Sequence, residues 1–429
     1  MASRRTPPVL VAVVIVVMSL PRMAWADHQT RRSVISPNAA GLVREAVKFV
    51  KGHSLGDLTS CERRMLEAAA DERPSDCHGE GTSKLGAHLH DQADDRSEGL
   101  LPREQATIKP VLIKWMLADP AATKHLRGNL LDVSGAYIGA LDLTDLSTLS
   151  TLSIRRSKIS HVNIRKARLV NLTLERCEVE QIDASQARVA DYIFLSHVHV
   201  LRNLELSKAE IGSVLLESST FESIAGLDVV ARDMCVLHSV DVRKAMDLRN
   251  GKFLSMQTID TRFGTFHSDS RVVVDERNLT IEKNYRMSSS TVNGGLDMSD
   301  STKIRGSLLI EDSAMFPNGD DLALIATGIA VAKIVRLIRM KTYGIVDFAK
   351  ADIGDSLQMN DSSVRCSPKP VRCGFSAKDS SIFRDFHWNR VSFAPGARLD
   401  LSAATLGSIW IDGPGGLRPN NLFIGELRY

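Results

Sequence analysis

The sequence predicts a mainly β protein, a right-handed quadrilateral β-helix solenoid that follows a small N-terminal helical region. Two observations predict this fold: apolar residues recur every five positions between Leu152 and Phe194, and a longer glycine-containing unit recurs at distant points of the chain. At 429 residues the chain is long enough for several ordinary domains, but a repeat architecture can absorb any length.

The five-residue pattern has two apolar slots in each unit. Seventeen of the eighteen slots are apolar, in a chain whose overall apolar content is 43%. This period fits neither a helix, which needs about 3.6 residues, nor a strand, which needs 2. It fits a chain that turns a corner every five residues and closes one coil in about 20 residues. The slots begin at Leu152, Ser157, Val162, Ala167, Leu172, Cys177, Ile182, Ala187 and Tyr192, each followed two residues later by the second slot.

The longer unit reads A-x-[IL]-G-x-[LVI]-x-[LIM]. It begins at Ala136, Ala209 and Ala404, and at Ala351 with one inserted residue. We interpret its glycine as a corner where the backbone conformation or tight packing disfavours a β-carbon. The dispersed copies extend the predicted solenoid over residues 128–429.

The apolar stretch from Leu322 to Ile338 has two possible interpretations. It could form a buried helix, because periodicity is ambiguous in so apolar a run. Its β-branched residues, and the copy that starts soon afterwards at Ala351, favour solenoid strands.

Residues 27–127 form the predicted helical region. Helices are expected over Ala39–Lys51, over Cys61–Asp71 with a capping box from Thr59 to Glu62, and over Arg103–Leu117. Residues 72–100, rich in Asp, Ser, Gly and His, are expected to be a loop. We expect the helices to cover the first edge of the solenoid, which would otherwise pair with other strands.

Residues 1–26 are typical of a signal peptide. Arg4 and Arg5 precede an apolar run from Val9 to Leu20, and Ala24-Trp25-Ala26 is a small-x-small cleavage site. The apolar run is shorter than the roughly 20 residues of a spanning helix, so we expect cleavage near Ala26 and no integral membrane span in the mature chain. An uncleaved anchor and twin-arginine export are the alternatives. The predicted location is the periplasm or the extracellular medium.

The mature chain is expected to be electrically neutral. Removing residues 1–26 takes away three of the 54 basic residues and none of the 51 acidic ones, which leaves 51 of each. A neutral surface lacks the long-range field that attracts phosphate backbones, so the sequence argues against a nucleic-acid partner.

The six cysteines divide into two kinds. In an exported chain we expect the disulfides Cys61–Cys77 and Cys366–Cys373, each of which closes a short segment. Cys177 and Cys235 lie within the repeats and are expected to be small core residues.

The repeat resembles that of pentapeptide-repeat proteins. The glycine-containing units, with the segment Trp115 to Pro120 ahead of them, resemble a bacterial pentapeptide-like family whose members are often labelled membrane-associated oxidoreductase. The resemblance covers about residues 110–429 and implies the β-helix fold. The label implies redox activity, but no G-x-G-x-x-G sequence follows a strand and opens a helix here, and no cofactor is expected.

Two clusters are candidate sites in the repeat region. His197 and His199 would face solvent together if Val198 points inward, at a spacing that can hold zinc. Because no third ligand can be identified, an ordinary surface pair is the favoured interpretation. Asp385, His387 and Trp388 could form a binding patch for a sugar or a protein. The alternative is that Phe386 and Trp388 pack into the core.

Loops supply weaker candidates. Cys77, His78, His88, His90 and Asp91 are metal-ligand types in one loop, but the cysteine is better used in a disulfide. The acid pairs Asp94-Asp95 and Asp320-Asp321 lie in polar, turn-rich sequence and are expected to be solvated loops.

The sequence favours a binding role over catalysis. A rigid neutral rod offers long preorganised surfaces, which suits a protein-protein interaction or envelope scaffold module, with another envelope protein as the expected partner. The alternative is an exported glycan-binding or metal-binding protein, or an enzyme, with a site in a loop. No catalytic residue can be singled out, and the sequence does not determine the oligomeric state.

Overall fold

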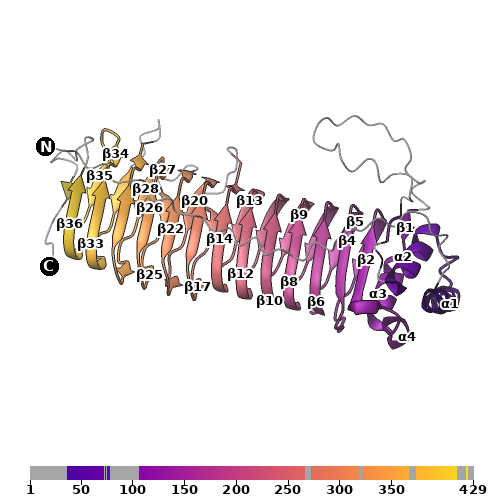
Figure 1. Ribbon diagram of the computed structural model, residues 1–429. Coiled ribbons are helices and arrows are strands. Elements are labelled where there is room, and N and C mark those ends of the chain that lie inside the picture. Colours follow the sequence, from indigo (N-terminus) through magenta and orange to yellow (C-terminus); the bar gives the residue numbers. More distant parts are fainter. Residues whose placement is uncertain are drawn as a thin grey trace, which may run out of the picture. The chain divides into compact units, whose positions relative to one another are not determined.

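The computed structural model describes residues 36–71, 73, 75–77, 106–265, 272–317, 322–366, 373–412 and 422–423. Parallel strands form a β-solenoid of about 12 turns, with a few helices near its N-terminal end (Figure 1). The predicted fold class is confirmed. The expected signal peptide, most of the 72–100 loop and the Asp320-Asp321 pair lie outside the described residues.

The helices precede the coils. They are α1 (Pro37–Gly52), α2 (Ser60–Ala70), α3 (Pro110–Ala118), α4 (Pro120–Thr123) and a 3-10 turn at Arg127–Asn129. The predicted capping box of α2 is present: Thr59 Oγ1 accepts from the Glu62 backbone N–H, and Glu62 accepts from the Thr59 backbone N–H.

The expected helix over Arg103–Leu117 is wrong over residues 106–109, and its first three residues lie outside the described part of the chain. Thr107–Ile108 forms strand β1, which pairs with Tyr137–Ile138 of the first coil. Helix α3 starts only at Pro110, because proline fits the first helical position, where no N–H is needed.

The strands form two parallel ladders. In the first coils each ladder has one long strand per coil, and in the later coils most strands divide into two short ones at a corner, although β33 and β36 of sheet B are again continuous. One ladder, sheet A, contains β1, β3 (Tyr137–Asp142), β5 (Lys158–Asn163), β7 (Glu178–Asp183), β9 (His199–Glu205), β11 (Thr220–Ala225), β13 (Asp241–Asp247), β15 (Arg262–Phe263), β16 (Val272–Asp275), β19 (Thr291–Asn293), β20 (Gly295–Asp297), β23 (Ala314–Phe316), β24 (Leu322–Ile325), β27 (Lys341–Thr342), β28 (Ile345–Asp347), β31 (Ser363–Val364), β32 (Gly374–Ser376), β34 (Ser392–Phe393), β35 (Arg398–Asp400) and β37 (Leu422–Phe423).

The other ladder, sheet B, lies on the opposite side of the core. It contains β2 (Leu130–Ser134), β4 (Thr151–Arg155), β6 (Arg168–Glu175), β8 (Arg188–Ser196), β10 (Glu210–Glu217), β12 (Val230–His238), β14 (Lys252–Ile259), β17 (Thr280–Ile281), β18 (Tyr285–Ser288), β21 (Lys303–Ile304), β22 (Leu308–Glu311), β25 (Ala330–Val331), β26 (Val335–Ile338), β29 (Asp352–Ile353), β30 (Leu357–Asn360), β33 (Ser381–Asn389) and β36 (Thr405–Asp412).

The apolar stretch Leu322 to Ile338 forms solenoid strands, as its β-branched residues indicated. It supplies β24 to sheet A and β25 and β26 to sheet B. Leu324, Val331 and Val335 are buried in the core.

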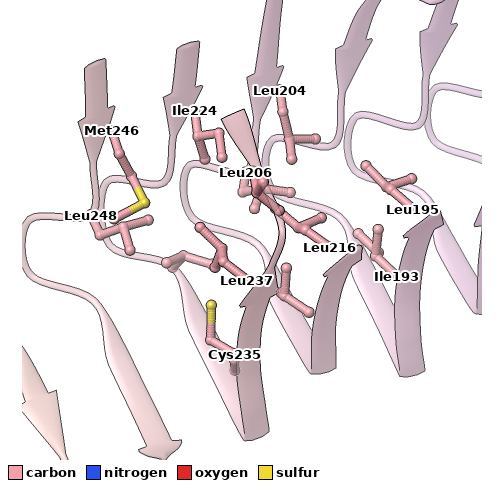
Figure 2. Close-up of a cluster of buried hydrophobic side chains, with 14 of the residues drawn as sticks. Ile193, Leu195, Leu204, Leu206, Leu216, Ile224, Cys235, Leu237, Met246 and Leu248 are labelled. Carbon is pink, nitrogen blue, oxygen red and sulfur yellow. The ribbon is translucent and has the colours of Figure 1, made fainter. Parts of the chain in front are cut away.

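The inward slots of the five-residue pattern are buried, except in its last unit. Tyr192 and Phe194 were expected to point inward, but Ile193 and Leu195 do so instead and are 0% exposed (Figure 2). The reason is an extra residue at a bulge: Leu169 pairs with Val189, whereas Asn171 pairs with Tyr192. The pattern therefore shifts by one position, and Tyr192 and Phe194 move to the outer face.

The repeated glycines mark close approaches of neighbouring coils. A β-carbon built on Gly212 would lie 2.1 Å from the Asp191 carbonyl oxygen, and one on Gly354 would lie 2.3 Å from the Ala332 carbonyl oxygen. Tight packing, rather than a positive φ, therefore requires glycine at these corners. Gly139 differs, because its nearest contact is Pro110 Cγ at 3.7 Å, an ordinary distance.

The N-terminal segments cover the first coil. Besides β1 on sheet A, the Cys77 backbone N–H donates to the Ser134 carbonyl at 3.0 Å, and Ser75 Oγ donates to the Asp132 carbonyl at 2.6 Å. The disulfide Cys61–Cys77 ties this covering segment to α2. Both ladders thus have partners at this end.

Candidate functional site

An apolar strip lies on the outer face of sheet B. It consists of five residues on three consecutive strands, Tyr192 and Phe194 on β8, Leu215 on β10, and Met234 and Val236 on β12, and we call it the outer strip. Phe194, Leu215 and Val236 are direct ladder neighbours, so they lie side by side across the strands. All five are half-buried, although the alternate residues between them already fill the core.

Charged residues border the outer strip on the same strands. Glu210 accepts from Arg188 and from Arg232, each at 3.4 Å, and the three side chains are between 42 and 60% exposed. The bend at Gly212 separates these charges from Leu215. An apolar centre beside a charged rim is the usual anatomy of a protein interface.

A second cluster lies on β33 and β36, towards the C-terminal end of sheet B. Trp410 Nε1 donates to Ser408 Oγ at 2.8 Å, and Ser408 Oγ donates to the Asp385 carboxylate. His387 Nε2 lies 3.6 Å from Asp385 Oδ2. The planes of the His387 and Trp410 rings are parallel within 8°, and the ring centroids lie 6.3 Å apart. Trp410 is 61% exposed.

This cluster corrects the predicted patch of Asp385, His387 and Trp388. Asp385 and His387 do lie together on the outer face, but Trp388 is only 2% exposed. Trp388 and Phe386 point into the core because residues of a strand alternate between its faces. The outer aromatic residue is Trp410, from the next coil.

Among the described residues, the contacts of Ser408 do not include a histidine base that could activate it as a nucleophile. A serine nucleophile needs a base within hydrogen-bond reach that takes its proton. Here the Ser408 hydroxyl is held by the Asp385 carboxylate and by the Trp410 indole, and His387 contacts Asp385 and not Ser408.

The histidine pair does not form a shared site. Val198 is buried, as expected, but His197 lies in a turn with φ of 53°, and its Nδ1 lies 3.0 Å from Ser196 Oγ. His199 belongs to β9, and its Nε2 is buried without a hydrogen-bond partner. Across the described ranges, no group of three or more His, Cys, Asp or Glu residues is placed to hold a metal ion.

The cysteines adopt both predicted states. Cys61–Cys77 and Cys366–Cys373 are disulfides, whereas Cys177 and Cys235 are buried thiols. Burial raises the pKa of the Cys177 thiol to about 11 and that of Cys235 to about 12, so neither is a reactive thiolate at neutral pH.

A carboxylic acid lies inside the core. Glu276 is 0% exposed, and burial raises its pKa to about 8, although a hydrogen bond from Tyr285 opposes the shift. The Tyr285 hydroxyl lies 3.4 Å from Glu276 Oε1, while Glu276 Oε2 and Thr258 Oγ1 are buried without partners. The carboxyl group is therefore mostly protonated at pH 7.

The surface of the described residues has shallow hollows. One, of about 450 Å³, lies beside Arg365, Phe393 and Pro395, and another, of about 400 Å³, lies beside Tyr137, Lys158 and Glu178. Arg365 stacks on the Tyr343 ring at 5.8 Å, and Lys158 pairs with Glu178 at 2.7 Å, so polar residues in both hollows are already engaged.

Searches with models of known protein families, among curated proteins and among solved structures each returned no match. Among the helices of the described segments, none has the length and apolar character needed to cross a membrane.

Proposed function

We propose that the protein is an exported interaction scaffold that binds another envelope protein through the outer strip on β8, β10 and β12. The observation that carries this proposal is the strip itself. Phe194, Leu215 and Val236 form a continuous apolar surface on strands whose other face already supplies the core. Apolar side chains that gather on an outer face, in addition to those that fill the core, are typical of a protein-binding surface.

The solenoid gives the strip a rigid base. The strands that carry it are hydrogen-bonded to a coil on each side, so its side chains are held in a fixed array before any partner arrives. Such preorganisation lowers the entropy cost of binding. The exposed Arg188, Glu210 and Arg232 side chains beside it supply charges that can select a partner of complementary pattern.

Export is part of the proposal. The two disulfides are compatible with an oxidising compartment, and residues 1–26 have the composition of a cleavable signal peptide. The kinship with pentapeptide-repeat proteins is likewise proposed, and the ladder step of 20 residues from Thr151 to Asn171 supports it.

The test is affinity capture of the tagged protein from the envelope after cross-linking, followed by mass spectrometry. The wild-type chain is compared with the double variant Phe194→Ser, Leu215→Ser. We expect one specific partner with the wild type and at least about a tenfold lower yield with the double variant, because truncating central interface residues typically costs more than about 1.4 kcal/mol.

The matched control is Leu201→Ser, which removes another exposed leucine, 45% accessible, outside the strip. It should capture the partner as well as the wild type does. Equal capture by the double variant, with an unchanged melting temperature, would contradict the proposed surface.

A further inference from the structure

Trp410 is the exposed aromatic ring of the last described strand of sheet B. Its outward position is shared by Gln358 and His387 on the two preceding coils, since these residues are ladder neighbours. His387 covers one side of the indole ring, and the side chain remains 61% exposed. A large planar apolar surface therefore faces the surroundings.

The orientation of this ring is fixed. The indole N–H is held by Ser408, and Ser408 is held in turn by Asp385 on the neighbouring strand. The parallel His387 ring supports the indole from the preceding coil. Because the rotamer is already restricted, a ligand that stacks on Trp410 need not order it.

Polar groups lie towards the covered side of the ring. His387 lies beneath the indole on the preceding coil, and Asp385, on the same coil, is bonded by Ser408 at the indole N–H edge. The Asp385 side chain is 35% exposed, so its carboxylate retains accessible surface at that edge. A carboxylate accepts hydrogen bonds from hydroxyl groups. An apolar face with an acceptor at one edge matches a ring that is apolar on its faces and hydroxylated around its rim.

We propose that Trp410 and Asp385, with His387 supporting the indole from below, form a binding site for a pyranose ring with equatorial substituents, as in β-1,4-linked glucose or N-acetylglucosamine chains. Such a ring presents axial C–H groups on its faces, which stack on the open face of the indole, and hydroxyl groups at its rim, one of which bonds Asp385 at the indole N–H edge. The site is separate from the outer strip, so either proposal can fail alone.

The test is a titration of the full mature chain with cellotetraose and with the tetramer of β-1,4-linked N-acetylglucosamine. The nitrogen-15 NMR signal of the Trp410 indole N–H, assigned with the Trp410→Phe variant, is the readout. We expect a saturable shift of this signal with at least one probe, while the buried Trp388 signal stays unchanged. Trp410→Ala should weaken binding about fivefold or more, the change that corresponds to a stacking contribution of about 1 kcal/mol.

Phe383→Ala is the matched control. Phe383 is 73% exposed on the same strand, β33, but lies within the irregularity between Ile382 and Asp385, before the residues that contact Trp410. This variant should keep the wild-type affinity. The proposal is overturned if neither probe shifts the Trp410 signal up to about 10 mM, or if Trp410→Ala binds as tightly as the wild type.

Discussion

Glu276 shows how a single side chain can depart from the pattern of its position. The equivalent positions in adjacent coils are Leu248 and Met298. At each of the three positions the backbone N–H donates to a carbonyl one coil further on, and the acceptors are Asp275, Asp297 and Ile325 in turn. All three side chains are buried, and only Glu276 is titratable. Its acid is therefore held neutral inside an apolar column.

This burial predicts a pH-dependent stability. The pKa is about 8 in the folded chain against 4.5 in the unfolded one, so the folded state holds the proton more tightly. The contribution of this bound proton to the free energy of unfolding is fully present below about pH 4.5. It is lost as the pH rises towards 8, at roughly 1.4 kcal/mol per pH unit. Unfolding by denaturant at pH 5 and pH 7.5 measures this loss.

Glu276→Gln is the reference for that measurement, because glutamine keeps the shape of the side chain without titrating. The wild type should lose stability relative to this variant by roughly 3 kcal/mol between the two pH values. A difference between the two chains that does not change with pH would show that Glu276 is not held neutral in the fold.

Sequence reasoning predicted most inward residues and two residues of the Trp410 cluster, Asp385 and His387, but it did not predict the outer strip or Trp410. It placed Tyr192 and Phe194 in the core, since one extra residue at a bulge cannot be read from apolar periodicity when Ile193 and Leu195 are apolar too. A signal for Trp410 did exist. In the unit that starts at Ala404, it stands at an intervening position between Ile409 and Ile411.

At the scale of elements, the first coil shows how a solenoid end is closed. Strand β1 completes sheet A, and the segment 75–77 bonds the edge of β2 in sheet B. Sequence reasoning expected helices in this role. The structure adds that backbone hydrogen bonds from extended segments do part of it, because an open strand edge needs donors and acceptors rather than apolar cover alone.

The disulfide Cys61–Cys77 should therefore protect against self-association. Replacing both cysteines by serine frees the segment that covers β2, and we expect a loss of roughly 2–4 kcal/mol together with concentration-dependent association. Light scattering and thermal unfolding measure the two effects.

Cys366→Ser with Cys373→Ser is the matched pair. That disulfide joins residues only 7 apart at a corner of sheet A and covers no strand edge. We expect no new association from it. If both double variants associate alike, or if neither does, the covering role of Cys61–Cys77 is wrong.

At the scale of the whole molecule, the solenoid separates stability from binding. Inward residues of each coil pack on neighbouring coils, as Figure 2 shows for Ile193, Leu216 and Leu237, which leaves the outward positions free to vary. The outer strip and the Trp410 site both occupy such positions on sheet B. Periodicity predicts a repeat fold because the core imposes it, and it says little about outward residues because the core does not constrain them.

The central claim is that the outer strip contacts a protein partner. The most direct measurement places a photo-reactive amino acid at position 194, 215 or 236 of the outer strip, and at the exposed position 158, 178 or 202 of sheet A, in living cells. The account predicts cross-links to one and the same envelope protein from the three strip positions, and none from the sheet A positions. Cross-links from sheet A alone, or none from the strip, would contradict it.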